Sequence, residues 1–206
     1  NVTATELAGA TELRELHLAD NDIDKIEDGA FSQLSNLRVL NLAQNKIRKI
    51  TNLTFAGLSN LEELKLSANE IKEVDWGAFS ELKQLRLLDL GTNRLTSVQL
   101  RGLTHLKKLY VNNNSIMTLK NVSLRDVNSL ILLNLDRNGV STIEEADLAS
   151  LATATRLTSL SMAANNLSVV HPRALAHISG ISYLALPNNE LRSLSHEGQP
   201  WLAPLK

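Results

Sequence analysis

Several common features are scarce in this 206-residue sequence, and each scarcity excludes a class of function. The chain has no cysteine, which rules out disulfides and thiolate metal sites within it. Lysine and arginine total 21 against 22 aspartate and glutamate residues, so charge gives no basis for binding nucleic acid or an anionic membrane. No stretch approaches 18 consecutive apolar residues. We therefore expect no nucleic-acid partner and no direct membrane insertion by this segment.

Signals of catalysis are missing as well. None of the five histidines has H-E-x-x-H spacing or a cluster of ligands around it. The sequence also lacks a G-x-S-x-G elbow, a phosphate-binding loop and a dinucleotide fingerprint. The sequence predicts no catalytic residue, no metal and no cofactor, and hence a protein that is not an enzyme.

A repeat dominates what is present. The frame LxxLxLxxNx(L/I/V) occurs eight times in register, at spacings of 24, 24, 24, 21, 24, 27 and 24 residues. The repeats start at Leu13, Leu37, Leu61, Leu85, Leu106, Leu130, Leu157 and Ile181. Each repeat supplies one short strand, and successive strands pair in parallel through right-handed connections. This pattern predicts an α/β-type leucine-rich repeat solenoid, a curved horseshoe with a concave parallel sheet of about eight strands and an irregular or short-helical convex side.

Both ends of the chain resemble interrupted repeats. Leu7–Thr11 has the pattern of a convex half without its strand, and Leu202–Leu205 resembles the entry to a ninth repeat. Terminal repeats of solenoids normally carry a polar cap, and neither end has one. We expect residues 1–206 to form a single array that is a fragment without terminal caps, or one capped by another segment.

Apolar residues recur on the return segments that lead from one strand to the next. We expect two columns of them to fill the layer between the sheet and the convex side. One column is Ile26, Ile50, Val74, Val98, Leu119, Ile143, Val170 and Leu194; the other is Phe31, Phe55 and Phe79, followed by Leu124, Leu148 and Leu175. The short repeat 85–105 and the long repeat 130–156 are expected to alter convex packing without disturbing the concave sheet.

The frame asparagine is present in all eight repeats. A polar residue this regular inside an apolar frame has to be satisfied where the strand ends, because an unpaired buried polar group costs roughly 1–3 kcal/mol. We predict a structural asparagine ladder made of Asn21, Asn45, Asn69, Asn93, Asn114, Asn138, Asn165 and Asn189.

The residues between the frame leucines should point outward on the concave face. Its larger groups gather near the middle of the array, where tyrosine and arginine lie among apolar side chains, a composition typical of interface centres. We predict a protein-binding site at this concave centre, made of Leu87, Asp89, Lys108, Tyr110, Asn112, Leu132, Asn134, Asp136 and Arg137.

Two further patterns concern residues expected on the surface: a column of charged residues and a set of glycosylation sequons. Asp22, Lys46, Glu70 and Arg94 occupy one repeat position with alternating sign and predict a surface salt-bridge ladder of about 0–1 kcal/mol per pair. Sequons mark Asn52, Asn121, Asn166 and Asn113 as candidate glycosylation sites, besides one at Asn1. Asn52 and Asn121 share one position on the return segment, whereas a glycan on Asn113 would obstruct the concave centre.

The frame and the tails "IEDGAFSQL", "ITNLTFAGL" and "VDWGAFSEL" resemble the typical leucine-rich repeats of extracellular proteins. Toll-type receptor ectodomains and secreted insect immune proteins are built from such repeats. The resemblance implies a non-catalytic recognition module of an extracellular, secreted or cell-surface protein in innate immunity or adhesion, with a protein ligand or co-receptor as partner. It is compatible with a homo-oligomer or a hetero-oligomer.

Two other functions fit the same repeats. One is an intracellular leucine-rich repeat scaffold or inhibitor. The other is an enzyme regulator or structural spacer that assembles through its lateral face. Glycan on Asn52 or Asn121 would exclude the cytosolic alternatives.

Overall fold

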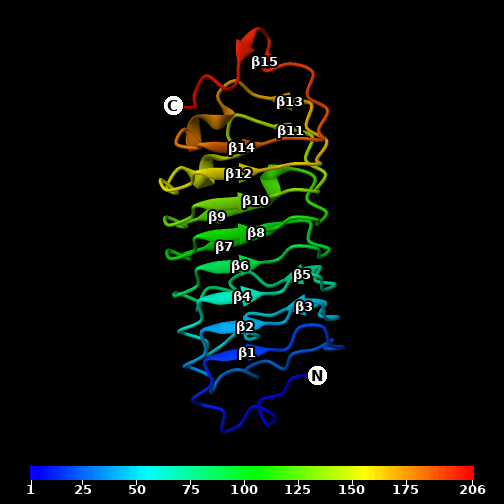
Figure 1. The fold of residues 1–206 in the computed structure, drawn as a ribbon, viewed down its shortest axis with the longest axis vertical. Coiled ribbons are helices and arrows are strands. Elements are labelled where there is room, and N and C mark those ends of the chain that lie inside the picture. The colour runs from blue at the N-terminus through cyan, green and yellow to red at the C-terminus, as the bar shows by residue number, and fades with distance from the viewer.

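A computed structural model describes all residues, 1–206, and shows a solenoid of parallel strands (Figure 1). Eight three-residue strands form one sheet in chain order, so the predicted leucine-rich repeat solenoid is confirmed. The strands of this main sheet are β1 (Glu15–His17), β2 (Val39–Asn41), β4 (Glu63–Lys65), β6 (Leu87–Asp89), β8 (Lys108–Tyr110), β10 (Leu132–Asn134), β12 (Ser159–Ser161) and β14 (Tyr183–Ala185).

The register of the main sheet follows the repeat frame. The middle residue of each strand faces the interior, and its two neighbours face outward, as the period of two requires. The inward column from Leu40 to Leu160 is buried, and the outward columns are exposed or half-buried. The sheet runs without interruption through the short repeat and the long repeat.

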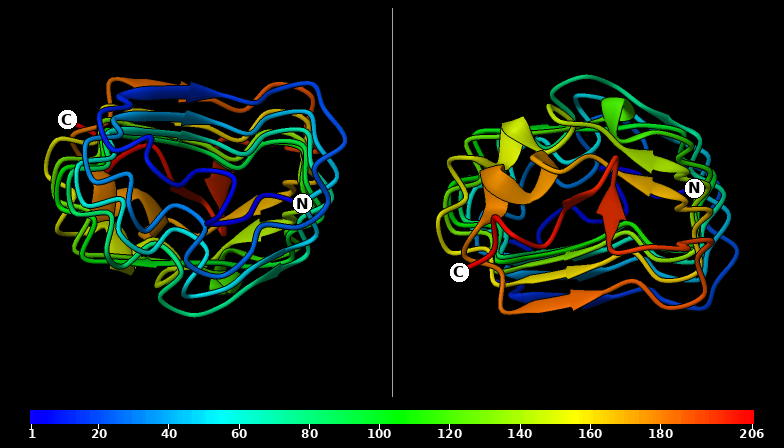
Figure 2. Two further views of the ribbon diagram at one scale, coloured as in Figure 1. Left: turned by 90° about the horizontal axis from the view of Figure 1, so that it is seen from below. Right: turned by 90° about the horizontal axis from the view of Figure 1, so that it is seen from above.

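The return side is less regular, as Figure 2 shows along the axis. It carries three parallel strand pairs and three short 3₁₀ helices in place of a continuous layer. The pairs are β3 (Lys49–Ile50) with β5 (Glu73–Val74), β7 (Val98–Arg101) with β9 (Val122–Arg125), and β11 (Thr142–Ile143) with β13 (Val169–Val170). The helices are η1 (Leu119–Asn121), η2 (Ala149–Leu151) and η3 (Ala174–Ile178).

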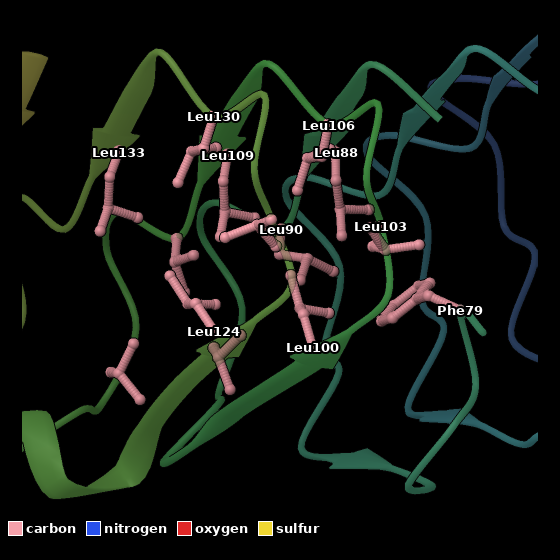
Figure 3. Packing of buried hydrophobic residues seen from close by; sticks show 14 of the residues in the cluster. Phe79, Leu88, Leu90, Leu100, Leu103, Leu106, Leu109, Leu124, Leu130 and Leu133 are labelled. Carbon is pink, nitrogen blue, oxygen red and sulfur yellow. The ribbon is translucent and has the colours of Figure 1, made fainter. Parts of the chain in front are cut away.

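Leucine and phenylalanine side chains fill the space between the two sides in one continuous core (Figure 3). Phe31, Phe55 and Phe79 stack, with ring centroids 6.3 and 5.9 Å apart. Leu100 and Leu124 fill the core on the return side beyond Phe79. Seven of the eight residues of the first predicted column lie in or against the core.

One expectation for the return side is corrected. Leu194, predicted to be a core residue, is 61% exposed, because the chain leaves the repeat path there for the hairpin of β15 (Ser195–His196) and β16 (Gln199–Pro200). The buried residue at this end is Trp201, whose indole donates to the Ser193 carbonyl at 3.3 Å. Val98 and Leu119 are both buried as predicted, although the strand partner of Val98 is Val122 and Leu119 lies in η1. Continuation of the array beyond the 206 residues stays a prediction.

Candidate protein-binding surface

The predicted concave centre lies on three neighbouring strands of the main sheet. In register, Leu87 of β6 lies beside Lys108 of β8, which lies beside Leu132 of β10. Two residues further along, Asp89, Tyr110 and Asn134 align in the same way. The sheet therefore brings these six side chains onto one outward face.

Several polar groups of this face are held by the protein itself. Asp89 Oδ1 accepts a hydrogen bond from the Gly91 amide at 3.0 Å, and Asn134 Oδ1 accepts one from the Asp136 amide at 2.9 Å. Asp136 Oδ1 in turn accepts from the Ser161 hydroxyl at 2.6 Å and from the Ala163 amide at 2.7 Å. These groups are positioned by the turns that follow the strands and are less available to a partner.

Other groups in the patch are free. No hydrogen bond or ion pair within the chain engages the Tyr110 hydroxyl or the Lys108 ammonium, and Leu87 and Leu132 beside them are only half-buried. An aromatic and a cationic group next to apolar side chains can desolvate against a protein surface and still form directional contacts. This combination occurs at the middle of the main sheet.

Asn112 and Arg137 lie at the edge of the patch. The Asn112 side chain covers Gly91: a Cβ added to that glycine would lie 2.8 Å from Asn112 Oδ1, so any larger residue there would displace the amide. Arg137 is exposed in the turn beyond β10, with a φ of 52°. Asn113 occupies the same repeat position one turn earlier, and its side-chain amide donates to the Thr92 hydroxyl at 3.3 Å.

The frame asparagines form one column below this surface. In seven of the eight repeats the amide donates to a carbonyl of its own turn and to one of the preceding turn, while its Oδ1 accepts a backbone amide from the preceding repeat. Asn114, for example, donates to Leu90 O and Val111 O and accepts from Leu95 N. Asn21 bonds only to carbonyls of its own turn.

The residue before each frame asparagine adopts a left-handed conformation, which the sequence did not reveal. Its φ lies between 52° and 59° in all eight repeats, at Asp20, Gln44, Ala68, Thr92, Asn113, Arg137, Ala164 and Asn188. Only some of these residue types favour that region, so the asparagine bonds hold the turn against the preference of the side chain.

The charged column breaks into pairs. Lys46 Nζ lies 2.6 Å from Asp22 Oδ1. Glu70 Oε2 forms ion pairs with Arg94 at 3.5 Å and with Arg48, which lies outside the column, at 3.1 Å. The hydrogen bond and the charge of Lys46 lower the pKa of the Asp22 carboxyl, and Asp22 raises the pKa of Lys46 in the same way. Both side chains are exposed to solvent, so the pair adds little to stability.

The candidate glycosylation sites differ in their surroundings. Asn52 and Asn166 are exposed, and neither side chain forms a hydrogen bond within the chain. Asn121 is exposed in η1 and donates to Thr96 O at 3.2 Å. Asn113 is exposed and engaged with Thr92.

Sequence reasoning missed one prominent residue. Trp76, on the return side after β5, is 70% exposed. It lies within the quoted tail "VDWGAFSEL", at a position occupied by Asn52 in the preceding repeat. A large aromatic residue at a position that is polar in the neighbouring repeat was the signal that could have found it.

Fold and surface together define a repeat solenoid whose extended faces present side chains for recognition. The pattern described as leucine rich repeat matches residues 11–71, 48–95 and 59–116, which together cover just over half of the chain. The protein belongs to the leucine-rich repeat family, and its resemblance to Toll-type receptor ectodomains is confirmed. No match was found among the curated proteins.

Solved structures resemble the chain over most of its length. A chain of the octameric complex of Latrophilin 3, Unc5D and FLRT2, in which FLRT2 contributes the leucine-rich repeats, is 28% identical over 92% of this chain and 58% of its own, with a TM-score of 0.77. The TLR13–ssRNA13 complex gives 27% identity over 99% and 34%, with a TM-score of 0.78. The Drosophila Toll–Spätzle complex gives 27% over 81% and 24%, with a TM-score of 0.70. The chain thus spans between 24% and 58% of the length of these three structures.

These comparisons bear on the partner and on the setting. Two of the three structures are complexes with other proteins, and one is a complex with RNA. The expectation of no nucleic-acid partner therefore stays a prediction that rests on charge alone. No helix of the chain is both long enough and apolar enough to cross a bilayer.

Proposed function

We propose that this chain is a non-catalytic recognition module of an extracellular or cell-surface protein, which binds a protein partner through the centre of its concave face. The observation that carries the proposal is the free Tyr110 hydroxyl and Lys108 ammonium between half-buried Leu87 and Leu132. An uninterrupted sheet fixes the backbone positions from which these side chains project, so a partner needs no backbone rearrangement to reach them. A role in innate immunity or adhesion is supported by the Toll, TLR13 and FLRT2 neighbours.

The binding site is tested with a partner found by screening the multimerised chain against a panel of secreted and cell-surface proteins. Affinity is then measured by surface plasmon resonance for Tyr110→Ala and Arg137→Ala. Each variant should weaken binding by more than about 1 kcal/mol, because Tyr110 is an aromatic anchor at the centre of the patch and Arg137 is a cationic contact at its edge. His17→Ala is the control, because His17 occupies the Tyr110 column on β1, at the far end of the sheet. Unchanged affinity in both variants would refute the concave site.

The extracellular setting has its own test. Protein from its native source, analysed by mass spectrometry, should carry N-linked glycan on Asn52 or Asn121, which are exposed on the return side. Glycan on either residue excludes an intracellular scaffold or inhibitor. Glycan on Asn113 would contradict the concave site while leaving the extracellular setting intact, because Asn113 lies in the turn at the edge of the patch.

A further inference from the structure

Strand pairing on the return side is interrupted between β5 and β7, as it is between β9 and β11. Val74 and Val98 occupy the same repeat position, yet β5 pairs only with β3 and β7 pairs only with β9. In three other repeats the residue after this position donates to the preceding repeat: Glu27 N to Val2 O at 2.9 Å, Asp75 N to Ile50 O at 2.9 Å and His171 N to Ile143 O at 2.8 Å. No corresponding bond joins β7 to β5.

One edge of β7 is therefore open. Gly102 N donates to Arg125 O at 3.1 Å, so this amide faces β9. Successive residues of a parallel strand direct their backbone groups to opposite sides, which turns the Gln99 and Arg101 amides away from β9. The far edge of β9 is partly covered, because Leu124 N donates to the Ser150 hydroxyl at 3.3 Å. An open strand edge can pair with an added peptide strand.

A pocket of about 170 Å³, lined by both apolar and polar side chains, lies beside this edge. Its apolar side is made by Val74, Phe79, Leu90, Leu95, Val98 and Leu100. Figure 3 shows Phe79, Leu90 and Leu100 among the packed core side chains. Trp76 lines the same opening and is 70% exposed. An enclosed apolar cavity of roughly 150 Å³ holds benzene, so this open pocket has room for one large apolar side chain beside the indole.

Basic side chains outnumber acidic ones around the pocket: Lys72, Lys83, Arg101 and Arg125 line it and the adjoining grooves, against Asp75 and Asp126. Arg101 of β7 and Arg125 of β9 are register partners, and like charges directly opposite each other are destabilising. Lys83 approaches the same loop: a Cβ on Gly102 would lie 3.3 Å from its Nζ. Asp126 lies 3.7 Å from Arg101, whereas Lys83 and Arg125 form no ion pair within the chain. An anionic ligand would relieve the repulsion between the two arginines.

We propose that this groove of the short repeat, formed by Trp76, β7, Arg125 and Lys83, is a second docking surface for an acidic peptide segment that carries one large apolar residue. The segment lies extended along the open edge of β7, its apolar residue fills the cavity beside Trp76, and its carboxylates neutralise Arg125 and Lys83. The groove lies across the core from the main sheet, where Leu100 and Leu124 face Leu88 and Leu109 (Figure 3). It therefore acts independently of the concave centre.

The test uses the 206-residue chain and three fluorescein-labelled peptides, followed by fluorescence anisotropy: DEVFVEDE, its cationic counterpart KKVFVKKK, and DESGSEDE, which lacks the apolar residues. We expect DEVFVEDE to bind and the other two to bind at least tenfold more weakly. The double variant Lys83→Glu, Arg125→Glu should lose at least tenfold in affinity for DEVFVEDE, and so should Trp76→Ala.

Matched controls separate this site from general charge and from the concave centre. Arg14→Glu with Lys107→Glu reverses two other exposed, unpaired cations and should leave the affinity unchanged, as should Tyr110→Ala. Thermal melting checks that each variant remains folded. The proposal is overturned if DEVFVEDE does not bind, if the groove double variant binds it like the unmodified chain, or if a heparin hexasaccharide binds at the groove and the peptide does not.

Discussion

At the scale of single residues, the frame asparagines connect one repeat to the next. Asn69 is buried; it donates to Leu42 O and Leu66 O at 3.0 Å each, and its Oδ1 accepts Ile47 N at 3.0 Å. Asn69→Ala should lower the free energy of unfolding by about 3 kcal/mol, because backbone groups of two repeats lose their partners. Asn21→Ala removes bonds to its own exposed turn only and should cost about 1 kcal/mol or less. Urea denaturation measures both, and equal losses would contradict the role of the column in joining repeats.

The left-handed turn residues allow a stabilising substitution. Thr92 has a φ of 53°, a region that β-branched residues rarely adopt and that asparagine tolerates. Thr92→Asn should therefore raise the free energy of unfolding by roughly 0.5–1 kcal/mol. Thr96→Asn, at an exposed threonine without positive φ, serves as the control and should change stability by less than about 0.5 kcal/mol. A destabilised Thr92→Asn variant would show that the turn is not strained.

At the scale of elements, the phenylalanine stack supports the return side of the first three repeats. Phe55 lies between Phe31 and Phe79 and is 1% exposed. Phe55→Ala should cost about 3–5 kcal/mol, because both stacked neighbours would face a cavity. Leu53→Ala, two residues away and exposed, should change stability by less than about 0.5 kcal/mol. Thermal or urea unfolding measures the stability of both variants. A loss of less than about 1 kcal/mol for Phe55→Ala would mean that Phe31 and Phe79 move to fill the cavity left by the ring.

The elements also show what sequence could and could not predict. The main-sheet strands follow from the leucine frame, because a buried residue between two outward ones leaves one register. The pairing of β7 with β9 was missed, although Val98-Gln99-Leu100-Arg101 and Val122-Ser123-Leu124-Arg125 share the pattern V-x-L-R. Counting residues from the start of each repeat places Val98 at the same position as Leu119. In the structure Val98 pairs with Val122, because Leu100 and Leu124, which fill the core, lie side by side and fix the register of the two strands. Core packing determines this register, so the spacing of residues in the sequence could not predict it.

At the scale of the whole molecule, the fold could be predicted because all eight repeats carry the same pattern. A repeat that departs from the pattern can still be assigned by comparison with the other seven. The candidate sites have no such redundancy. The concave centre could be placed from the alternation of Lys108, Leu109 and Tyr110, but which of its polar groups are free depends on turns such as that of Asp136. Trp76 and its cavity depend on a break between β5 and β7 that no single repeat displays.

A solenoid of this kind is stabilised by contacts between neighbouring repeats, so its stability should vary along the axis. In hydrogen exchange, the slowest amides should be those that join central strands, such as Leu90 N to Tyr110 O at 2.8 Å and Val111 N to Asn134 O at 2.9 Å. Amides near β15 and β16 should exchange early, because that hairpin is largely exposed and pairs only with itself. On the return side, Gln99 and Arg101 should exchange far faster than Asp75, whose amide bonds to Ile50 O. Protection of Gln99 equal to that of Asp75 would mean that β5 and β7 pair in solution, which would close the groove beside Trp76.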